Sequence, residues 1–461
     1  MVRVIPMFVL ASLASARSIS QVHLGLTNAV LDCPNGISVA FSSDDADPVT
    51  VSLFAGDGTN PSDDVALQTA QSASHIYQSP HKTYTSPPLH VAYLCNLAPN
   101  TAYAYSIDDG DAGFRASFTT PAAVGSRNDM TILGVVGDTD MTPTTYEALA
   151  LAYKNQSTQA IIVVGDWAYA NGNHKKWDQW FDAQQPVFSN VPVLGINGNH
   201  EVVIPSIGHS IEKYNGYLNR VVTPITADAR ANLRTYYSFD IGLVHAVFLD
   251  DYAGLQNYDF GSDLLGLRTI GSAKWVTERQ RQLEWFEADL KAVDRATTPY
   301  VVVYKHNGYY NTYTDHQCQC SKAIFEIDDP AACWKGKYHS GLAFSEPHCG
   351  QQAKFEDLYV RYGVQVVFSG HCHGYERTDA IVKNKINKEK GVVYVTTGAG
   401  GRGHGGSRIA NPPAWSRKTI SDTFGASRVI ATKDKMQIVW LSNDDPNTAQ
   451  DSFEILPRQT E

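Results

Sequence analysis

The chain lacks long apolar runs beyond its first twenty residues, since nowhere else does it approach the roughly 18 apolar residues that a membrane-spanning helix needs. It also lacks an excess of positive charge, because 37 Lys and Arg residues stand against 47 Asp and Glu residues, for a formal net charge of -10. Nucleic acids and anionic membranes favour basic protein surfaces, so this balance argues against either as a partner. A small anionic substrate stays compatible with it, because bound metal ions can outweigh the overall charge locally.

Internal repeats, low-complexity tracts and the G-x-S-x-G signature of a nucleophilic serine are absent as well. The 461 residues are too many for one ordinary core, and 43% of them are hydrophobic while 18% are charged. We therefore expect a globular protein of two or three domains.

Cysteine is scarce, and its count of seven is odd, so at least one cysteine stays outside any disulfide of the chain. Cys33 and Cys95 stand alone in the first part of the chain and are expected to pair with each other. Four further cysteines cluster in one short segment at 318–349, where we expect two disulfides that stabilise an inserted loop, with a structural zinc site as the alternative. Cys372 is then the odd cysteine. The clustered cysteines are Cys318, Cys320, Cys333 and Cys349.

Residues 1–16 have the pattern of a secretory signal peptide. Arg3 precedes an apolar run at 4–13, and small residues follow, so cleavage is expected after Ala16. A buried first strand is the alternative interpretation. Secretion would place the mature protein in an extracellular, oxidising setting, where disulfides form and where the sequon at Asn155 could carry a glycan.

The segment at 17–122 has short apolar stretches that alternate with period two and are separated by Asp, Ser, Pro and Gly. This pattern predicts a small antiparallel β-sandwich domain. The segment has no dense cluster of His, Asp or Cys, so we expect no chemistry in it. A linker at 119–130 leads into the rest of the chain.

From residue 131 the pattern changes to seven continuous apolar runs, which are typical of buried strands covered on both faces. Helical periodicity appears at 277–295 and 351–363, with Thr277 expected as the first N-cap and Gly363 just beyond the second helix. Strands and helices together predict a layered α/β domain over 128–461, with a cysteine-rich insertion at 317–350. The runs are 131–136, 160–164, 191–196, 243–249, 300–304, 364–369 and 391–397.

Residues able to bind metal ions follow five of these runs. In an α/β sheet the ligand crevice lies beyond the carboxyl ends of the strands, so these side chains are expected to converge. One Asp after a strand is usually a turn residue, but five such positions are hard to explain as turns. They are Asp138, Asp166 with Tyr169, Asn199 with His200, His306, and His371 with His373.

These residue types suit a pair of metal ions, because carboxylate, phenolate and amide oxygens are hard ligands and imidazoles are borderline. The carboxylate of Asp166 could bridge two ions. A phenolate from Tyr169 favours a trivalent ion, because a phenol with a pKa of about 10 needs a large shift to ionise.

In this order the five strand ends resemble the sequence blocks DxG, GDxxY, GNHE/D, VxxH and GHxH of the purple acid phosphatases, within the calcineurin-like metallophosphoesterases. The resemblance covers essentially the whole mature chain. It implies a fibronectin III-like sandwich followed by an α/β catalytic domain, a β-sandwich core with flanking helices. The blocks read Asp138-Thr139-Asp140, Gly165-Asp166-Trp167-Ala168-Tyr169, Gly198-Asn199-His200-Glu201, Val303-Tyr304-Lys305-His306 and Gly370-His371-Cys372-His373.

The resemblance also implies a role for each site residue. It assigns His200 to phosphate binding and protonation of the leaving group, and it matches His316 to the second member of a histidine pair in plant-type relatives. It divides the ligands between two ions. An Fe(III) would be bound by Asp138, Asp166, Tyr169 and His373, and a divalent Zn, Fe or Mn ion by Asp166, Asn199, His306 and His371.

The function implied is that of a secreted acid phosphatase, in which a metal-bound hydroxide attacks phosphate monoesters in line. A secreted phosphodiesterase or nucleotide pyrophosphatase on the same core is the alternative, and a non-enzymatic phosphate-binding protein is a further one. Two departures from the family pattern are Asp140 and Asp315, which would add negative charge near the iron and the incoming phosphate. The glycine-rich stretch at 398–406, with His404, is expected as a flexible loop near the crevice.

Overall fold

The computed structural model describes residues 17–59, 65–107, 113–153, 158–202, 212–255, 272–316, 318–319, 337–338 and 349–458. Outside them lie the predicted signal peptide, the sequon at Asn155 and most of the cysteine-rich insertion. The pairings predicted for Cys318, Cys320, Cys333 and Cys349 therefore stay predictions. Within the insertion, strands β15 (Cys318–Gln319) and β16 (Lys337–Tyr338) pair antiparallel.

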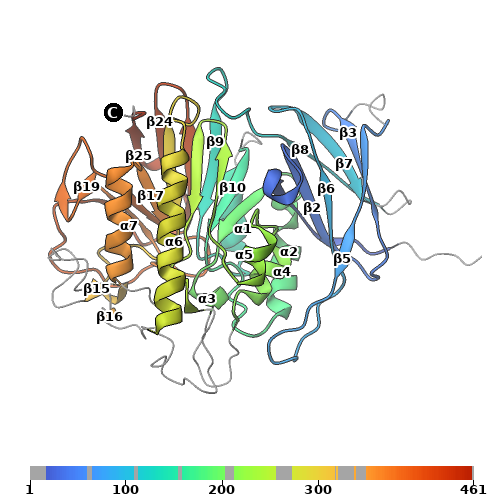
Figure 1. The fold of residues 1–461 in the computed structure, drawn as a ribbon, viewed down its shortest axis with the longest axis horizontal. Coiled ribbons are helices and arrows are strands. Elements are labelled where there is room, and N and C mark those ends of the chain that lie inside the picture. The colour runs from blue at the N-terminus through green and yellow to red at the C-terminus, as the bar shows by residue number, and fades with distance from the viewer. Residues whose placement is uncertain are drawn as a thin grey trace, which may run out of the picture.

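The first part of the described chain forms two four-stranded antiparallel sheets, as Figure 1 shows in blue. Apolar side chains alternate along the strands and fill the space between the sheets, so the predicted β-sandwich is confirmed. The predicted disulfide between Cys33 and Cys95 is also confirmed. One sheet has the order β1 (Ser20–Thr27), β2 (Gly36–Ser42), β6 (Leu89–Leu94), β5 (Ala73–His75), and the other β4 (Gln68–Gln71), β3 (Thr50–Ala55), β7 (Ala102–Ile107), β8 (Phe114–Thr119).

The second part contains two larger sheets that pack face to face. All seven predicted apolar runs form strands of these sheets. The six-stranded sheet has the order β11 (Val193–Ile196), β10 (Ala160–Val164), β9 (Thr131–Val136), β23 (Gly425–Ala431), β24 (Met436–Ser442), β25 (Ala449–Ile455). The seven-stranded sheet has the order β12 (Tyr237–Ile241), β13 (Val244–Phe248), β14 (Tyr300–Tyr304), β17 (Val366–Ser369), β21 (Val393–Thr397), β18 (Tyr375–Thr378), β22 (Ser416–Ile420).

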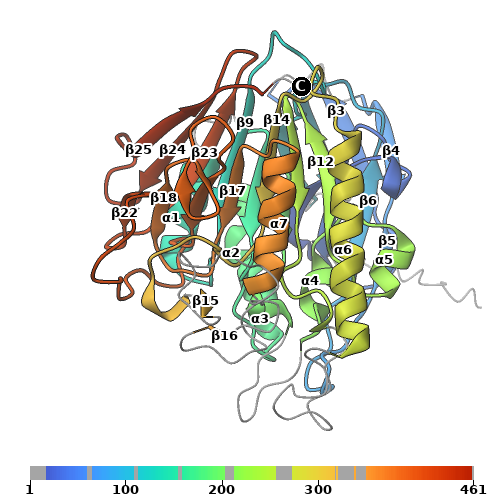
Figure 2. The ribbon, with the colours of Figure 1, turned by 60° about the vertical axis from the view of Figure 1, so that its left-hand side comes forward.

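Each central strand is buried on both faces, which explains the continuous apolar runs. In β14, Val302 and Tyr304 join the core between the sheets, while Val301 and Val303 pack under helices α6 (Ala273–Ala292) and α7 (Cys349–Arg361). Figure 2 shows these two helices side by side over the seven-stranded sheet. Helices α1 (Pro143–Tyr153) and α2 (Lys175–Phe188) contribute their buried side chains to the core of the six-stranded sheet. The layered α/β architecture is confirmed.

The sequence predicted the end of α7 correctly but not the start of α6. Gly363 has a positive φ of 69° just beyond α7, as predicted. The predicted N-cap Thr277 is wrong, because α6 begins one turn earlier, at Ser272, whose side chain accepts the N–H of Trp275. Trp275 is buried, and its packing extends the helix, while Thr277 donates to the carbonyl of Ala273 inside it. Among the described helices, none has the length and apolarity to cross a membrane.

The two parts of the chain share a buried polar interface centred on Arg220, at the end of helix α4 (Asn215–Arg220). The guanidinium donates to Tyr77 at 3.0 Å, Gln21 at 2.8 Å and Tyr84 at 2.6 Å, all from the N-terminal sandwich. It also pairs with Asp178 of α2 at 2.6 Å. The remaining short helices are α3 (Asn199–Val202) and α5 (Ala227–Ala231), and two further short strands are β19 (Ile381–Val382) and β20 (Lys385–Ile386).

Candidate metal centre

The predicted ligands meet where the carboxyl ends of parallel strands from both large sheets converge. β9, β10 and β11 run parallel in one sheet, and β13, β14, β17 and β21 run parallel in the other. Backbone hydrogen bonds join successive strand ends, from Asp138 N–H to the carbonyl of Gly165 at 3.1 Å and from Gly370 N–H to that of His306 at 2.9 Å. A Cβ added at Gly370 would overlap the Asp138 carboxylate, so glycine there allows this close approach.

Several of the predicted ligands have left-handed backbone conformations. The φ angles are 58° at Asp138, 53° at Asp166, 46° at Tyr169 and 68° at His371. A bulky side chain rarely adopts this region, and it persists only where surrounding contacts determine it. All four residues are buried. The backbone is therefore held in a costly conformation that turns these side chains toward one another.

One group of ligand atoms consists of Asp138, Tyr169 and His373. The Tyr169 hydroxyl lies 3.1 Å from Asp138 Oδ1 and 3.1 Å from His373 Nε2. His373 Nε2 lies 3.5 Å from the same carboxylate oxygen. The second Asp138 oxygen accepts the backbone N–H of His371 at 2.7 Å, which fixes the carboxylate.

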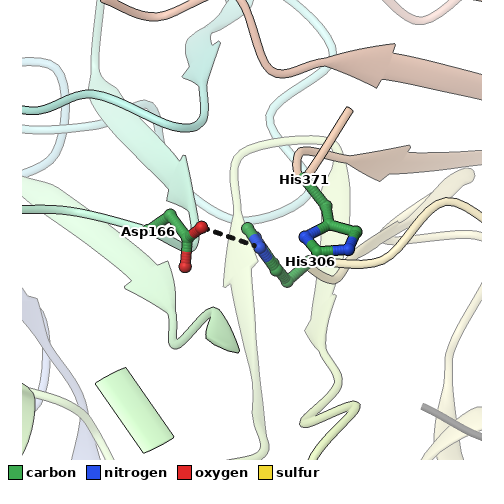
Figure 3. Close-up of side chains that lie close together, drawn as sticks. All are labelled: Asp166, His306 and His371. Atoms are coloured by element: carbon green, nitrogen blue, oxygen red, sulfur yellow. Dashed lines mark ion pairs between the residues drawn. The ribbon is translucent and has the colours of Figure 1, made fainter. Parts of the chain in front are cut away.

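A second group consists of Asp166, Asn199, His306 and His371. His306 Nε2 lies 3.3 Å from Asp166 Oδ2 and 3.0 Å from Asn199 Oδ1. The ligand atoms of Asp166, His306 and His371 all lie within 4.8 Å of one another, and Figure 3 shows the three side chains close together, with the Asp166 carboxylate facing the His306 ring. His306 Nδ1 donates to the carbonyl of Val164 at 2.8 Å, because a carbonyl can only accept, and this leaves the Nε2 lone pair for a ligand.

These spacings fit bound metal ions. Atoms that each lie about 2.0–2.2 Å from one ion are about 3.0–3.5 Å apart in octahedral or tetrahedral arrangements, and the contacts of Tyr169 with Asp138 and of His306 with Asp166 and Asn199 have such spacings. The donor set of oxygen and imidazole nitrogen suits iron, zinc and manganese. The first group contains three of the four residues that the family resemblance assigned to Fe(III), without Asp166, and the second contains the four that it assigned to the divalent ion.

The pKa shifts at the site also indicate that its buried carboxylates need positive charge nearby. Burial, followed by the charges of Asp138 and Asp166, raises the pKa of the Tyr169 phenol well above its usual range. Burial alone would lower the pKa of His306, but Asp166 and Asp138 outweigh it and raise that pKa to about 10. A phenol and imidazoles packed against buried carboxylates therefore hold protons where positive metal ions would otherwise balance the charge.

Two carboxylates outside the predicted ligand set hold the strand ends in place. Glu201 accepts the backbone N–H groups of Asp166, Trp167 and Gly198 at 2.8–3.0 Å. Asp251 accepts the N–H of His306 at 3.1 Å. Glu201 was visible as the last residue of its sequence block, whereas no pattern around Asp251 marked it as a support.

A cavity of about 350 Å³ opens onto the two groups, and five histidines line it, namely His200, His316, His371, His373 and His404. His200 Nδ1 lies 2.6 Å from Asn171 Oδ1, and its Nε2 lies 3.8 Å from Asp166. The ring of His316 lies 4.3 Å from that of His371. The side chain of Asp315 lies outside the described residues, so its expected effect on phosphate binding stays a prediction. Sequence reasoning missed Tyr313 and Ser407 at this cavity, and it missed Asn171 beside His200. It placed His404 in a loop near the crevice, with an approach to substrate as the alternative, and His404 lines the cavity.

The segment 370–374 differs from the sequence-based expectation. The pattern predicted an extended segment with His371 and His373 on the same side, but these residues form no strand. Instead, the left-handed backbone of His371 and two tight turns bring both histidines to the cavity, with Cys372 N–H bonded to Gly370 and Gly374 N–H bonded to Cys372. Cys372 is fully buried and forms no disulfide with another described cysteine.

A larger cavity, of about 600 Å³, lies between the C-terminal ends of α6 and α7 and contains none of the predicted ligands. Two of the cations that line it, Arg295 and Arg458, donate to backbone carbonyls such as those of Tyr362 and Gly391. These arginines connect backbone segments that are distant in the sequence, so we assign the cavity a structural role.

Comparison with known families adds an independent observation. The sequence profile of the calcineurin-like phosphoesterases matches residues 132–375. A profile described as iron/zinc purple acid phosphatase-like protein C matches residues 391–452. The first match contains every predicted metal ligand.

Three of the curated relatives are plant proteins. Purple acid phosphatase 22 of Arabidopsis thaliana is 28% identical over 368 residues, which span 79% of this chain and 71% of that protein. Purple acid phosphatase 1 of Ipomoea batatas is 28% identical over 394 residues, or 81% of this chain and 72% of that protein. The Fe(3+)-Zn(2+) purple acid phosphatase 12 of Arabidopsis thaliana is 25% identical over 394 residues, with 81% and 73% spanned.

Solved structures share the fold. A purple acid phosphatase from yellow lupin (Lupinus luteus) seeds aligns with a TM-score of 0.69 at 18% identity, over 95% of this chain and 74% of that one. The structure of PhoD aligns with a TM-score of 0.62 at 13% identity, over 95% of this chain and 90% of that one. Identities this low establish the common fold and no more.

Proposed function

The chain belongs to the calcineurin-like phosphoesterases and, within them, to the purple acid phosphatases, and from this premise we propose that it hydrolyses phosphate monoesters at a centre of Fe(III) and one divalent ion. Zinc, iron and manganese all fit the divalent position. A relative whose name gives Fe(3+) and Zn(2+) supports this pairing.

The observation that carries the proposal is the division of the ligands into two groups. Asp138, Tyr169 and His373 form the harder group, which suits Fe(III) because its phenol needs a strongly Lewis-acidic partner to ionise. The group of Asp166, Asn199, His306 and His371 has a single carboxylate and two imidazoles, which suits a divalent ion. Asp166 would be a ligand in both sets, as the resemblance implied.

Two bound ions supply the Lewis acidity and the hydroxide nucleophile that phosphate-ester hydrolysis requires. The protein does the remaining work. His200 lies at the mouth of the second group, a quarter exposed to the cavity, with its ring fixed by Asn171. We assign to it the donation of a proton to the leaving alkoxide. His316 and Asn199 line the same cavity and are proposed to hold the phosphoryl oxygens.

We further propose that the enzyme works outside the cell at acidic pH. A trivalent ion keeps hydroxide available in acid, and the predicted signal peptide would direct the chain to secretion. The disulfide between Cys33 and Cys95 supports an oxidising environment.

The test combines a spectrum, a metal analysis and a substrate panel on the purified protein. We expect a broad visible band from charge transfer between Tyr169 and Fe(III), one iron and one divalent ion per chain, and hydrolysis of aryl and alkyl phosphate monoesters in acid. Tyr169→Phe should abolish the band. Tyr313→Phe is the matched control, because Tyr313 lines the cavity but belongs to neither ligand group.

Three outcomes would contradict the proposal in different ways. A colourless protein that contains only zinc would remove the iron. Preferential hydrolysis of phosphodiesters or nucleotide pyrophosphates would change the substrate class. Phosphate binding without turnover would indicate a non-enzymatic protein.

A further inference from the structure

The extra carboxylate of Asp140 does not add an uncompensated charge to the site. Its Oδ1 accepts the N–H of Met141 at 2.7 Å, and its Oδ2 pairs with the guanidinium of Arg402 at 2.7 Å. Its backbone has φ 79°, a conformation that aspartate tolerates better than most residues, and its N–H donates to the carbonyl of Trp167 at 2.8 Å. The carboxylate therefore faces a cation from the glycine-rich loop.

Arg402 is held at both its ends. Its backbone N–H donates to the carbonyl of Asp138 at 2.9 Å, while its side chain reaches Asp140. The preceding Gly401 has φ 140°, and its carbonyl accepts the hydroxyl of Thr142 at 3.0 Å. A Cβ at Gly401 would overlap the hydroxyl of Thr145, so the loop is closely fitted against the first strand end. The loop was expected to be flexible, but these contacts fix its path near Arg402.

The guanidinium lies over the ring of Tyr169. Its central carbon is 4.8 Å from the ring centroid, well within the roughly 6 Å over which a cation attracts an aromatic face. The hydroxyl of the same ring touches Asp138 and His373. Asp140 therefore acts on Tyr169 indirectly, because it pairs with the guanidinium of Arg402 that lies over the ring.

We propose that Arg402, fixed by Asp140, is a positioning residue for Tyr169. It holds the ring in the orientation that aims its oxygen at the Fe(III) position, and its charge stabilises electron density on that ring. This inference rests on the proposed function of Tyr169 as an iron ligand. Because the cation makes electrons on the ring harder to remove, charge transfer from the ring to iron requires more energy than it would without Arg402.

The test is the position of the visible band in the metal-loaded protein. Relative to the unsubstituted protein, Arg402→Gln should move the band to longer wavelength at unchanged metal content. Arg402→Lys keeps the charge and should show a smaller shift in the same direction. Asp140→Asn should move it in the same direction by less. Arg408→Gln is the matched control, because Arg408 follows the same loop by two residues and lies 4.6 Å over the ring of Tyr313, outside both ligand groups. It should leave the band in place.

A band that stays in place in Arg402→Gln, with both metals retained, would overturn the inference. A wild-type protein without the band would instead overturn the proposed iron site. In that case a double-mutant cycle between Arg402→Gln and Tyr169→Leu, measured by thermal unfolding, tests whether Arg402 acts on Tyr169. The two shifts in midpoint should then be clearly non-additive, and additive shifts would show that Arg402 does not act on Tyr169.

Discussion

Left-handed backbone occurs in the N-terminal sandwich and at the metal centre, but its surroundings differ. In the sandwich it includes the exposed turn residues Asp32, Asn35, Asn96 and Asn100. At the metal centre it includes the buried residues Asp138, Asp166, Tyr169 and His371. Asn and Asp adopt this conformation at low cost in turns, and His is also enriched in it, whereas a bulky residue such as Tyr rarely adopts it.

The difference shows what the conformation is used for in each region. In the sandwich it reverses the chain, and any residue that tolerates a turn would serve. At the metal centre a buried bulky residue such as Tyr169 holds this conformation at a cost of about 1–3 kcal/mol, which the contacts around the strand ends offset. Glu201 and the close contact of Gly370 with Asp138 are two of the devices. The following predictions, from the largest effect to the smallest, test whether this division holds.

Exchange of an aspartate should have opposite consequences in the two regions. Asp166→Ala removes a ligand shared by the proposed ions, so activity should fall by at least about 100-fold and the divalent ion should be lost. Asp32→Ala removes the same side chain from the same backbone region in an exposed turn, and it should leave activity and metal content unchanged. Elemental analysis and phosphatase assays measure both. Comparable losses in the two variants would break the comparison.

Loss of His200 should affect some substrates far more than others. His200→Ala should lower turnover of alkyl phosphates by about 100- to 10,000-fold, because their leaving groups need a proton, and that of aryl phosphates much less. Asn171→Ala should give a smaller loss of the same kind, since it only frees the His200 ring. Steady-state rates on a matched pair of esters provide the measurement. Equal losses on both esters would remove the proton-donor role.

Removal of the disulfide should weaken the fold without touching the chemistry. The double variant Cys33→Ala with Cys95→Ala opens a covalent link between residues 62 positions apart, which should lower the free energy of unfolding by about 2–4 kcal/mol. Denaturant unfolding measures the loss, and turnover per folded molecule should be unchanged. A large drop in turnover under native conditions would tie the sandwich to the active site.

A smaller effect on stability concerns His245, which lies in the second part of the chain but away from the strand ends that carry the proposed ligands. Burial alone would lower its pKa, but hydrogen bonds to Asp240 at 2.6 Å and Asp289 at 3.0 Å raise it to about 9. Protonated His245 therefore stabilises the fold fully below about pH 6.5, and this contribution is lost as the pH rises toward 9.

His245→Gln should accordingly cost on the order of 2 kcal/mol at pH 6 and much less at pH 9.5, as measured by unfolding at each pH. The exposed His81, exchanged to Gln, is the control and should show no such dependence. A cost for His245→Gln that does not vary with pH would show that its ion pairs contribute nothing.

The smallest effect is expected at Cys372, between two proposed ligands. Cys372→Ala removes a buried sulfur that lies in neither ligand group, so both ions and most activity should remain. His371→Ala, one residue away, should lose the divalent ion. Metal analysis of the two neighbours gives a sharp contrast, and loss of metal from Cys372→Ala would assign the thiol to the site.

Much of this arrangement could be predicted from the sequence, because strand ends carry local signals. Continuous apolar runs marked the strands, and polar residues directly after them marked Asp138, Asp166 and His306. The resemblance to a family then divided the ligands. These inferences needed only short-range patterns and the rule that parallel strands present their carboxyl ends together.

The rest depended on contacts between distant parts of the chain. Asp140 and Arg402 are 262 positions apart, so their pairing left no local trace. The left-handed conformation of His371 was missed because nothing in GHCHG says which residue turns the chain. Ser272 was missed as the cap of α6 because Trp275, which anchors that turn, gains its role only from the core.

The interface around Arg220 bears on how the two parts of the chain unfold. Three of its acceptors, Gln21, Tyr77 and Tyr84, belong to the N-terminal sandwich, and Arg220 itself is buried. If the sandwich melted first, it would take these acceptors away and leave donors of a buried cation without hydrogen bonds, at a cost of several kcal/mol. Partial melting is therefore disfavoured. The two parts should lose their structure in one cooperative transition, although the proposed metal ligands all lie in the second.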